Sequence, residues 1–480
     1  MTVERLSSST KVTLTLLLIS TFVLFLNETI LGVALPQIME HLKITAATGQ
    51  WLTTAYMLTM AVVIPTSGYL MQRLGNRNVF MIAMSLFVVG SLISALSVGF
   101  QMLLIGRIFQ AAGTAVMSPL LMVAIMTLVP DSRRGSLMGT VSIVMSLAPA
   151  VGPTVSGLIL SFADWRWLFW LVLPIAAAAL ITGIRKLPTL GQRTNAPLDV
   201  PSVILAAFTF SSLVYGLSSF AEQARGTATT IEPGVIVGFG VALLAVFVFR
   251  QLKLHKTDRA LLDLRTFRSR SFTVAVLIFT VINMSLFGTF ILLPIYMQTA
   301  LGITPLMTGT YLLPGGLIMG FMGPVVGRRY DKVGARPLVI IGSSIASLSL
   351  WGMATFDANT PQLLIPAAHI VLSVGLSLLF TPMFTFSMSS VPPQLYPHAS
   401  SIMGTIQQVA GAAGTALFVT LFTAAQVASQ RAGGTVALST VDGTRAAFIV
   451  GAVLSLVTLG LSFTVHKPAT DAEKAHELDH

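Results

Sequence analysis

The sequence predicts an all-α integral membrane protein with fourteen transmembrane helices. Three observations support this prediction: 54% of the 480 residues are hydrophobic, only 9% are charged, and the apolar residues fall into fourteen long runs. A soluble domain carries about 25% charged residues, so this composition cannot cover a water-facing surface. It argues against a soluble enzyme and a nucleic-acid-binding protein. It also argues against intrinsic disorder, which needs low hydrophobicity.

Each run is long enough to cross a bilayer as a helix, which takes about 20 mostly apolar residues. Strands of a membrane barrel would be about 9–11 residues of alternating polarity, a pattern that is absent here. The first run is longer than the apolar core of about 7–15 residues in a signal peptide, so we interpret it as a retained helix. The expected spans are 12–36, 51–71, 79–99, 102–128, 136–162, 166–184, 200–220, 233–252, 272–297, 306–327, 337–356, 361–389, 399–426 and 446–466.

The positions of Lys and Arg predict the orientation of these spans. With the N-terminus inside, 22 of the 28 Lys and Arg residues fall in inner segments, five fall in outer segments, and Arg107 lies within a span. Because Lys and Arg concentrate on the cytoplasmic side of membrane proteins, both termini are expected to be cytoplasmic, in a multi-pass protein of the cytoplasmic (plasma) membrane. The net charge of +11 is then an insertion signal, and no nucleic-acid partner is expected.

Some chemistry is excluded by residues that the sequence lacks. Cysteine is absent, which removes disulfides, thiolate catalysis and Cys-ligated metal sites. No G-x-x-x-x-G-K-[ST] segment is present, so ATP is not expected to drive the protein. We therefore expect no catalytic residues, no metal and no cofactor.

An internal repeat divides the chain. The pattern G-x-x-x-(D/Q)-(R/K)-x-G-x-R occurs twice, each time after the second span of a six-span unit. The spans would then form two six-helix bundles, spans 1–6 and 9–14, with spans 7 and 8 as an insert. We expect an N-terminal bundle over 1–190, the insert and a basic linker over 191–262, a C-terminal bundle over 263–466 and a disordered cytoplasmic tail over 467–480. The repeated residues are Gly68, Gln72, Arg73, Gly75 and Arg77, then Gly327, Asp331, Lys332, Gly334 and Arg336.

Several further motifs follow the spans in order. Span 1 ends with Asn27-Glu28-Thr29 and then Ala34-Leu35-Pro36, and span 2 opens with Trp51-Leu-Thr-Thr-Ala-Tyr56. Later motifs are Arg107 with Gln110 in span 4, Gly152-Pro153 with Gly157 in span 5, and Gln407-Gln408 in span 13. In these motifs and the loop repeat the chain resembles the major facilitator superfamily. It most resembles the fourteen-span drug–proton antiporters, and among them the lincomycin-resistance-type branch.

The chain departs from that family at a few positions. Glu28 stands where the family usually has Asp, Ala111 replaces a Gly, and Gln407 stands where many relatives have Arg. Gln72 replaces the usual Asp of the first loop motif, whereas the second copy keeps Asp331. The sequence therefore leaves open whether the first copy can latch the cytoplasmic side.

Ionisable residues inside spans are costly and are treated as functional by default. At 1.5 Å per residue, Glu28 and Arg107 lie about 12 Å and about 8 Å below the outer edge, and His369 lies at a similar depth. We hypothesise that Glu28 carries the coupled proton and that Arg107 tunes it, with His369 as a further candidate. The alternatives are a structural Glu28–Arg107 pair that joins spans 1 and 4, and a packing role for His369.

Other residues are candidates for the substrate cavity and for gating. Gly152, Pro153 and Gly157 would bend span 5 and let a neighbouring helix approach, and the loop repeat would latch the inner gate. The alternatives are the ordinary use of Gly and Pro in membrane helices and plain positive-inside charge. Polar anchors for the cavity are Asn27, Trp51, Tyr56, Gln110, Asn283, Gln407 and Gln408.

The resemblance implies a monomeric, proton-coupled antiporter in the bilayer that exports lipophilic antibiotics or dyes by alternating access. Its partners would be lipophilic small molecules, protons and lipid. The alternative is a proton-coupled exporter of a physiological lipid, peptide or metabolite, with drug resistance incidental. A membrane-embedded enzyme would need clustered His, Asp or Glu, and a sensor would need a folded domain outside the membrane. The sequence shows neither feature.

Overall fold

A computed structural model describes residues 7–44, 46–188, 199–224, 231–255 and 259–465. The side chains of a few helical residues, Pro149 and Pro153 among them, lie outside this description. The expected tail 467–480 and residues 191–198 of the expected insert also lie entirely outside the described residues.

The described chain folds into fourteen long α-helices. Two 3₁₀ turns precede α9 and α13, and a π-helical turn, Tyr296–Ala300, continues α9. The helices are α1 Ser8–Leu42, α2 Ala46–Leu74, α3 Asn76–Ala95, α4 Phe100–Leu128, α5 Asp131–Leu160, α6 Trp167–Lys186, α7 Val200–Ala224, α8 Pro233–Leu254, α9 Arg270–Ile295, α10 Pro305–Val333, α11 Ala335–Met353, α12 Leu364–Ser389, α13 Tyr396–Arg431 and α14 Val436–Ser462.

Thirteen of these helices carry an apolar stretch long enough to cross a membrane, and α5 is the remaining one. The all-α membrane architecture expected from the sequence is therefore confirmed. The ends of the helices differ from the predicted spans, most of all at α14, which begins ten residues before its predicted start. The extra turns are polar. Thr435 caps the helix, and Ser429 Oγ donates to the Asp442 carboxylate at 2.6 Å, so the α13–α14 hairpin is held by hydrogen bonds that an apolar-run criterion misses.

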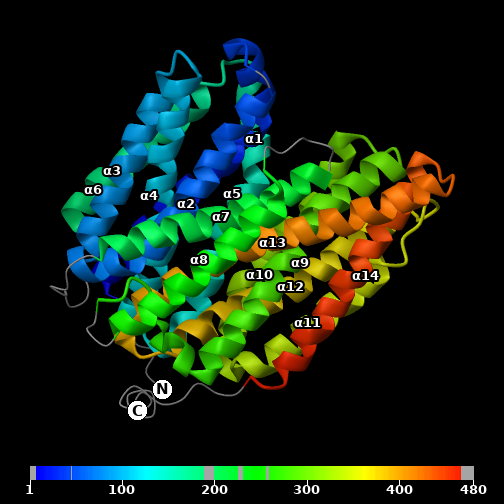
Figure 1. The fold of residues 1–480 in the computed structure, drawn as a ribbon. Coiled ribbons are helices and arrows are strands. Elements are labelled where there is room, and N and C mark those ends of the chain that lie inside the picture. Colours follow the sequence, from blue (N-terminus) through cyan, green and yellow to red (C-terminus); the bar gives the residue numbers. More distant parts are fainter. Residues whose placement is uncertain (1–6, 45, 189–198, 225–230, 256–258, 466–480) are drawn as a thin grey trace.

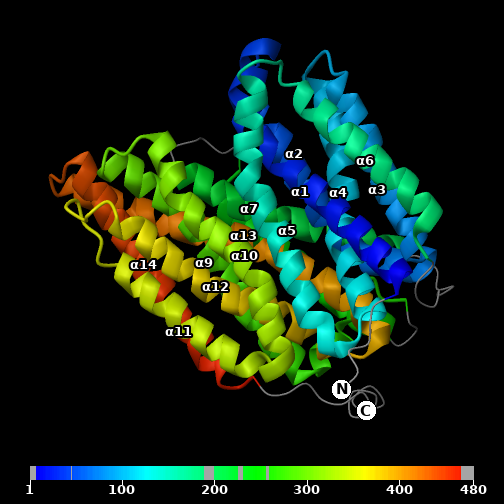
Figure 2. The same cartoon turned by 180° about the vertical axis from the view of Figure 1, so that it is seen from behind.

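The first six helices form one bundle and α9–α14 form the other (Figure 1). Their ribbons lie together where α13 begins and diverge toward the ends of α1 and α13, in both views (Figures 1 and 2). We call the end that carries the α2–α3, α4–α5 and α10–α11 turns the basic end. The turns of the two loop repeats contain Gly75 and Gly334, both at φ 78°, a backbone conformation that glycine adopts at little cost.

The two extra helices, α7 and α8, pack against each other, and α7 also packs on α2 and α13. The Trp51 ring of α2 stacks on the Tyr215 ring of α7, with the centroids 6.5 Å apart. The two helices of the insert are also joined by an ion pair between Asp199 and Arg250, at 2.7 Å. The insert therefore covers the seam that α2 and α13 form between the two bundles.

Candidate functional site

The candidate site starts from Arg107, which α4 buries almost completely, with 1% of its surface exposed. Its Nη1 donates to Asn27 Oδ1 of α1 and to Gln110 Oε1 of α4, each at 3.0 Å. Its guanidinium lies 4.1 Å from the centroid of the Tyr56 ring of α2. Arg107 therefore joins three helices of the first bundle, and because a buried cation is costly, these contacts are needed to hold it.

Further hydrogen bonds to α3 and α4 hold Gln110 and Tyr56 in place. Gln110 Nε2 donates to Ser91 Oγ of α3 at 3.0 Å, and the Tyr56 hydroxyl donates to Thr114 Oγ1 at 2.8 Å. Ser91 and Thr114 were not among the predicted site residues. Serine and threonine are common in apolar helices, so the sequence alone gave no signal that distinguishes these two.

Glu28 follows Asn27 on α1 and keeps part of its surface exposed. It lies near enough to Arg107 and Tyr56 for the charges to interact, yet no hydrogen bond or ion pair joins Glu28 to another described residue. Arg107 Nε and Asn27 Nδ2 are buried and find no hydrogen-bond partner in the described part of the chain. The structural alternative, a direct ion pair between Glu28 and Arg107, is therefore not formed. The Arg107 guanidinium donates a hydrogen bond to Asn27 instead.

His369 lies in the other bundle. It is buried in α12, and α10 passes so close that a side-chain carbon on Gly315 would collide with the imidazole. Its Nδ1 has no hydrogen-bond partner among the described residues. The structure brings Glu28 and Arg107 together but shows no contact that links His369 to either of them.

The predicted cavity residues fall into two groups. Asn27, Tyr56, Gln110 and Asn283 are buried, the first three in the Arg107 cluster and Asn283 in α9, where its Nδ2 donates to the Phe279 carbonyl at 2.7 Å. The second group keeps exposed surface: Trp51, at 47%, and the half-exposed Gln407 and Gln408.

At the basic end the two loop repeats each reach across to the other bundle. Asp331, near the end of α10, accepts hydrogen bonds from the backbone N–H groups of Gly135 and Ser136 at 2.8 and 2.9 Å. These groups belong to the second turn of α5, close to its N-terminus, where the helix dipole favours an anion. The Asp331 carboxylate thus holds α10 on α5.

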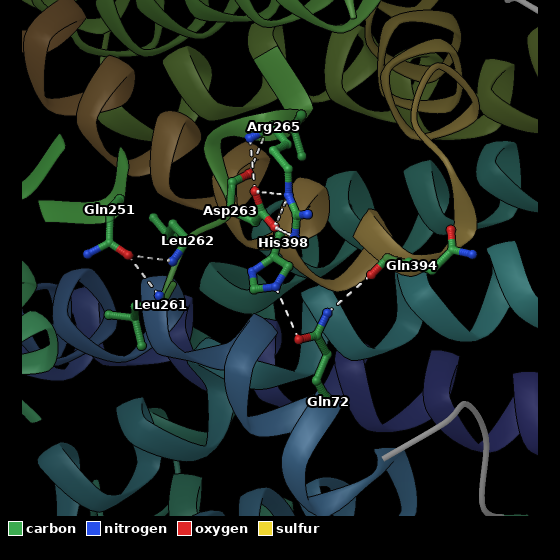
Figure 3. A network of polar contacts seen from close by, with 9 residues as sticks. Gln72, Gln251, Leu261, Leu262, Asp263, Arg265, Gln394 and His398 are labelled. Atoms are coloured by element: carbon green, nitrogen blue, oxygen red, sulfur yellow. Dashed lines mark hydrogen bonds and ion pairs between the residues drawn. The ribbon is translucent and has the colours of Figure 1, made fainter. Parts of the chain in front are cut away.

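The first copy reaches α13 in the equivalent way but with neutral groups (Figure 3). Gln72 Nε2 donates to the Gln394 carbonyl at 3.1 Å, and Gln72 Oε1 lies 3.2 Å from His398 Nε2. The glutamine that replaces the family's Asp therefore still contacts the opposite bundle. His398 was not among the predicted site residues.

The linker before α9 closes over the same region. Gln251 Oε1 of α8 accepts from the backbone N–H of Leu261 at 2.7 Å and of Leu262 at 3.3 Å (Figure 3). Burial raises the pKa of the Asp263 carboxyl, but the hydrogen bonds and charge of Arg265 together with the nearby His398 leave that pKa below its ordinary value. The insert, the linker and α13 thus meet at one network beside Gln72.

The other predicted gating residues also have defined places. Arg73 donates to the Tyr69 hydroxyl and Arg77 donates to the Ile184 carbonyl, each at 2.6 Å. Lys332 and Arg336 are exposed. Gly68 lies against Pro397 and Ser401 of α13, and a side chain at Gly327 would collide with the carbonyl of Gly135.

In α5, a side-chain carbon on Gly152 would meet the Thr29 hydroxyl of α1, so that glycine permits a close approach of the two helices. Nothing lies within 4 Å of the position that a Gly157 side chain would take. The Pro153 side chain lies outside the described residues.

The polar contacts between the bundles lie at the basic end or at mid-depth within the described chain. Ser67 and Ser401 hydroxyls are 2.8 Å apart, Ser142 and Thr381 hydroxyls are 2.6 Å apart, and the deepest contact is Gln408 Nε2 to Met60 Sδ, at 3.8 Å. The structure is therefore closed at the basic end, with the ribbons of the bundles diverging toward the opposite end (Figure 2).

Comparison with known proteins identifies the family to which this chain is similar and several similar transporters and resistance proteins. Residues 17–415 match the Major Facilitator Superfamily. The chain is 38% identical to the lincomycin resistance protein LmrB of Listeria innocua over 94% of this chain and 95% of that protein. It is 29% identical to a multidrug resistance protein B homolog of Mycobacterium tuberculosis, over 83% of this chain and 73% of that protein. The human organic anion transporter MFSD10 has the same fold, with a TM-score of 0.69, 14% identity, and coverage of 94% of this chain and 99% of that one.

Proposed function

The chain belongs to the Major Facilitator Superfamily and is a transporter rather than an enzyme, and we propose that it is a proton-coupled antiporter that exports lipophilic drugs. Relatives named for lincomycin and multidrug resistance support the drug part of this proposal. The Glu28–Arg107 arrangement supports the proton part. The placement of the basic end in the cytoplasm rests on the Lys and Arg count.

One observation carries the proton coupling: Arg107 is buried without a carboxylate partner, while Glu28 lies beside it and keeps exposed surface. An ionised Glu28 balances the charge of Arg107. A protonated Glu28 leaves that cation with only Asn27, Gln110 and the Tyr56 ring. Because charge is costly in a membrane interior, burial favours the protonated state of Glu28, whereas Arg107 favours the ionised state. A conformational change that alters this balance would let Glu28 bind a proton on one side and release it on the other, which is what a proton carrier requires.

The closed basic end supports the following transport cycle. With the basic end closed, Glu28 would exchange protons and release drug toward the opposite, outer end. Opening of the basic end would let Glu28 release its proton into the cytoplasm. A lipophilic, polar or cationic drug would then bind beside Glu28 and Arg107 in place of the proton. The drug and the proton would then compete for one region, which couples their opposite movements.

The test is drug-induced proton movement in inverted vesicles. A pH gradient is established, and a lincosamide, puromycin or ethidium is added to vesicles that carry the wild type, Glu28→Gln or Glu40→Gln. Glu40 is an exposed acid near the end of the same helix and serves as the matched control. We expect the drugs to dissipate the gradient in the wild type and in Glu40→Gln, and to have no effect in Glu28→Gln, which should still bind the drug.

Two outcomes would contradict the proposal in different ways. Normal exchange by Glu28→Gln would mean that the proton is carried elsewhere, and His369→Asn would be the next variant. If no drug moves protons in the wild type, the drug-antiport function is wrong, and an exporter of a physiological lipid, peptide or metabolite becomes the better description.

A further inference from the structure

The two seams between the bundles are not equivalent. The seam between α2 and α13 is covered by α7 of the insert. The seam between α5 and α10 has no such cover among the described helices, and a cavity of about 1020 Å³ opens beside it at the basic end. Residues of the first turns of α5 and the last turns of α10 line most of this cavity, with one residue each from α11 and α12. We call it the α5–α10 groove.

The rim of the groove is strongly cationic. Arg133 of α5 and Arg328, Arg329 and Lys332 of α10 line it. No hydrogen bond or ion pair joins the side chains of these four residues to any other residue in the described part of the chain. The one acid in the lining, Asp331, already has both carboxylate oxygens occupied by backbone N–H groups of α5. The rim therefore presents four cations against a single carboxylate, and that carboxylate forms its hydrogen bonds with α5 rather than with the four cations.

The groove becomes apolar with depth. Its walls below the rim are Met322, Val325, Val326 and the neighbouring Leu137, and Val325 is 56% exposed. Met322 precedes Lys332 by ten residues on α10, which corresponds to about 15 Å along the helix. That length equals about half of the hydrocarbon thickness of a bilayer, so the groove runs from headgroup depth through one leaflet.

From this combination of charge and depth we propose that the α5–α10 groove binds an anionic phospholipid of the leaflet at the basic end. The phosphate lies among Arg133, Arg328 and Arg329, and an acyl chain lies along Met322 and Val325. Charge complementarity and the change from cationic to apolar lining select a lipid, because a free phosphate would use only the rim. The bound lipid contacts both bundles at their closed end and stabilises that closure.

The test compares lipid binding to the purified full-length protein. Native mass spectrometry and thermal unfolding are measured with added phosphatidylglycerol, with phosphatidylcholine, and with glycerol phosphate as the headgroup alone. The variant is Arg133→Gln/Arg328→Gln/Arg329→Gln. The control, Arg185→Gln/Lys186→Gln, removes exposed cations at the end of α6, which also lies at the basic end but outside the groove.

We expect the wild type and the control to retain phosphatidylglycerol and to unfold at a higher temperature with it than with phosphatidylcholine. In the triple variant we expect the apparent affinity for phosphatidylglycerol to fall at least about tenfold, since a juxtamembrane cation contributes about 1 kcal/mol to anionic-lipid attraction. Unfolding in phosphatidylcholine reports whether that variant is folded. Val325→Trp, which narrows the apolar part, should also weaken phosphatidylglycerol binding and leave the rim charges in place.

Three results would overturn the proposal. The first is equal binding of the two lipids by the wild type. The second is an unchanged preference in the triple variant, which would place the anionic-lipid contacts elsewhere on the basic end. The third is full stabilisation by glycerol phosphate alone, which would make the groove an anion site rather than a lipid site. Drug-coupled proton movement is not used in any of these readouts, so the antiport proposal is tested separately.

Discussion

At the scale of single residues, Arg107 organises the first bundle. It contacts α1 and α2, and through Gln110 it is also connected to α3. A hydrogen bond to a charged group contributes about 1.5–3 kcal/mol, so the two bonds from Nη1 hold the guanidinium in one place. The position of that charge then determines the electrostatic field at Glu28.

We predict that the charge of Arg107 matters more than its shape. Arg107→Lys keeps a cation but loses the planar group that lies over Tyr56, so coupled transport should fall by about tenfold and persist. Arg107→Gln removes the cation, and drug-induced proton movement should be abolished. Both variants are measured in inverted vesicles, with drug binding as the control for folding. Equal activity of the two variants would show that the charge is not part of coupling.

The sequence predicted Glu28 and Arg107 as neighbours in depth but could not identify the partner of Arg107. Depth follows from counting residues, and an error of two or three residues changes it by only a few ångströms. Rotation about a helix axis changes by about 100° per residue, so the same error decides whether Asn27 or Glu28 faces α4. The buried Ser91 and Thr114 could not be selected for the same reason.

At the scale of elements, the helices of the insert are joined by a polar pair outside the apolar spans. Hydrogen bonds from Arg250 hold the pKa of the Asp199 carboxyl below its ordinary value. A carboxyl whose pKa is lower in the folded than in the unfolded protein stabilises the fold fully above the unfolded value of about 3.9. That stabilisation is lost as the pH falls through the folded value.

We predict from this that Asp199→Asn lowers the midpoint of thermal unfolding at neutral pH. The difference between wild type and variant should be constant between about pH 5 and pH 8 and should shrink below about pH 4. Circular dichroism of the purified protein at a series of pH values measures it. If the difference in unfolding midpoint stays constant down to about pH 3, the charge of Asp199 contributes nothing to the stability of the insert.

The contact of α5 with α10 gives a second prediction at this scale. A side chain at Gly327 would collide with the backbone of Gly135, whereas nothing lies within 4 Å of the position of a Gly316 side chain on the same helix. Gly327→Ala should therefore favour separation of the basic ends of α5 and α10, and Gly316→Ala should not. Spin labels on the two helices measure that distance. Since Gly→Ala raises helix propensity similarly at both sites, a shift in both variants would contradict the steric explanation.

The duplicated loop was the most informative sequence signal for the elements. Its spacing predicted where the two bundles repeat, and the structure places both copies at the basic end, Asp331 on α5 and Gln72 beside α13. The repeat could not show that Gln72 still crosses to the other bundle, because that contact needs His398 and Gln394, which lie more than 300 residues away in sequence. Nor could it show that α7 packs over α2 and α13.

At the scale of the whole molecule, the two bundles are joined at one end and diverge toward the other (Figure 1). In the proposed transport cycle this is the state in which the basic end is closed. Beside the hydrogen bonds of Gln72 and Asp331, pairs of hydroxyl groups join the two bundles at this end, Ser67 with Ser401 and Ser142 with Thr381. Such contacts are individually weak, at about 0.5–1.5 kcal/mol for each hydrogen bond. This end can therefore open and close at moderate cost, and export requires that it does so.

This leads to a prediction that the absence of cysteine makes direct to test. In a chain without cysteine, the double variant Ser67→Cys/Ser401→Cys has a single pair of thiols, at positions whose hydroxyls are 2.8 Å apart. Because the two hydroxyl oxygens are in contact, sulfur atoms in their place can reach each other, so mild oxidation should form a disulfide between α2 and α13. Transport should then fall nearly to zero and return on reduction, because the bond fixes the closed basic end. The two single variants should transport with or without oxidant. Continued transport by the fully crosslinked protein would mean that substrate does not pass through the basic end between α2 and α13, and the export cycle proposed above would have to be abandoned.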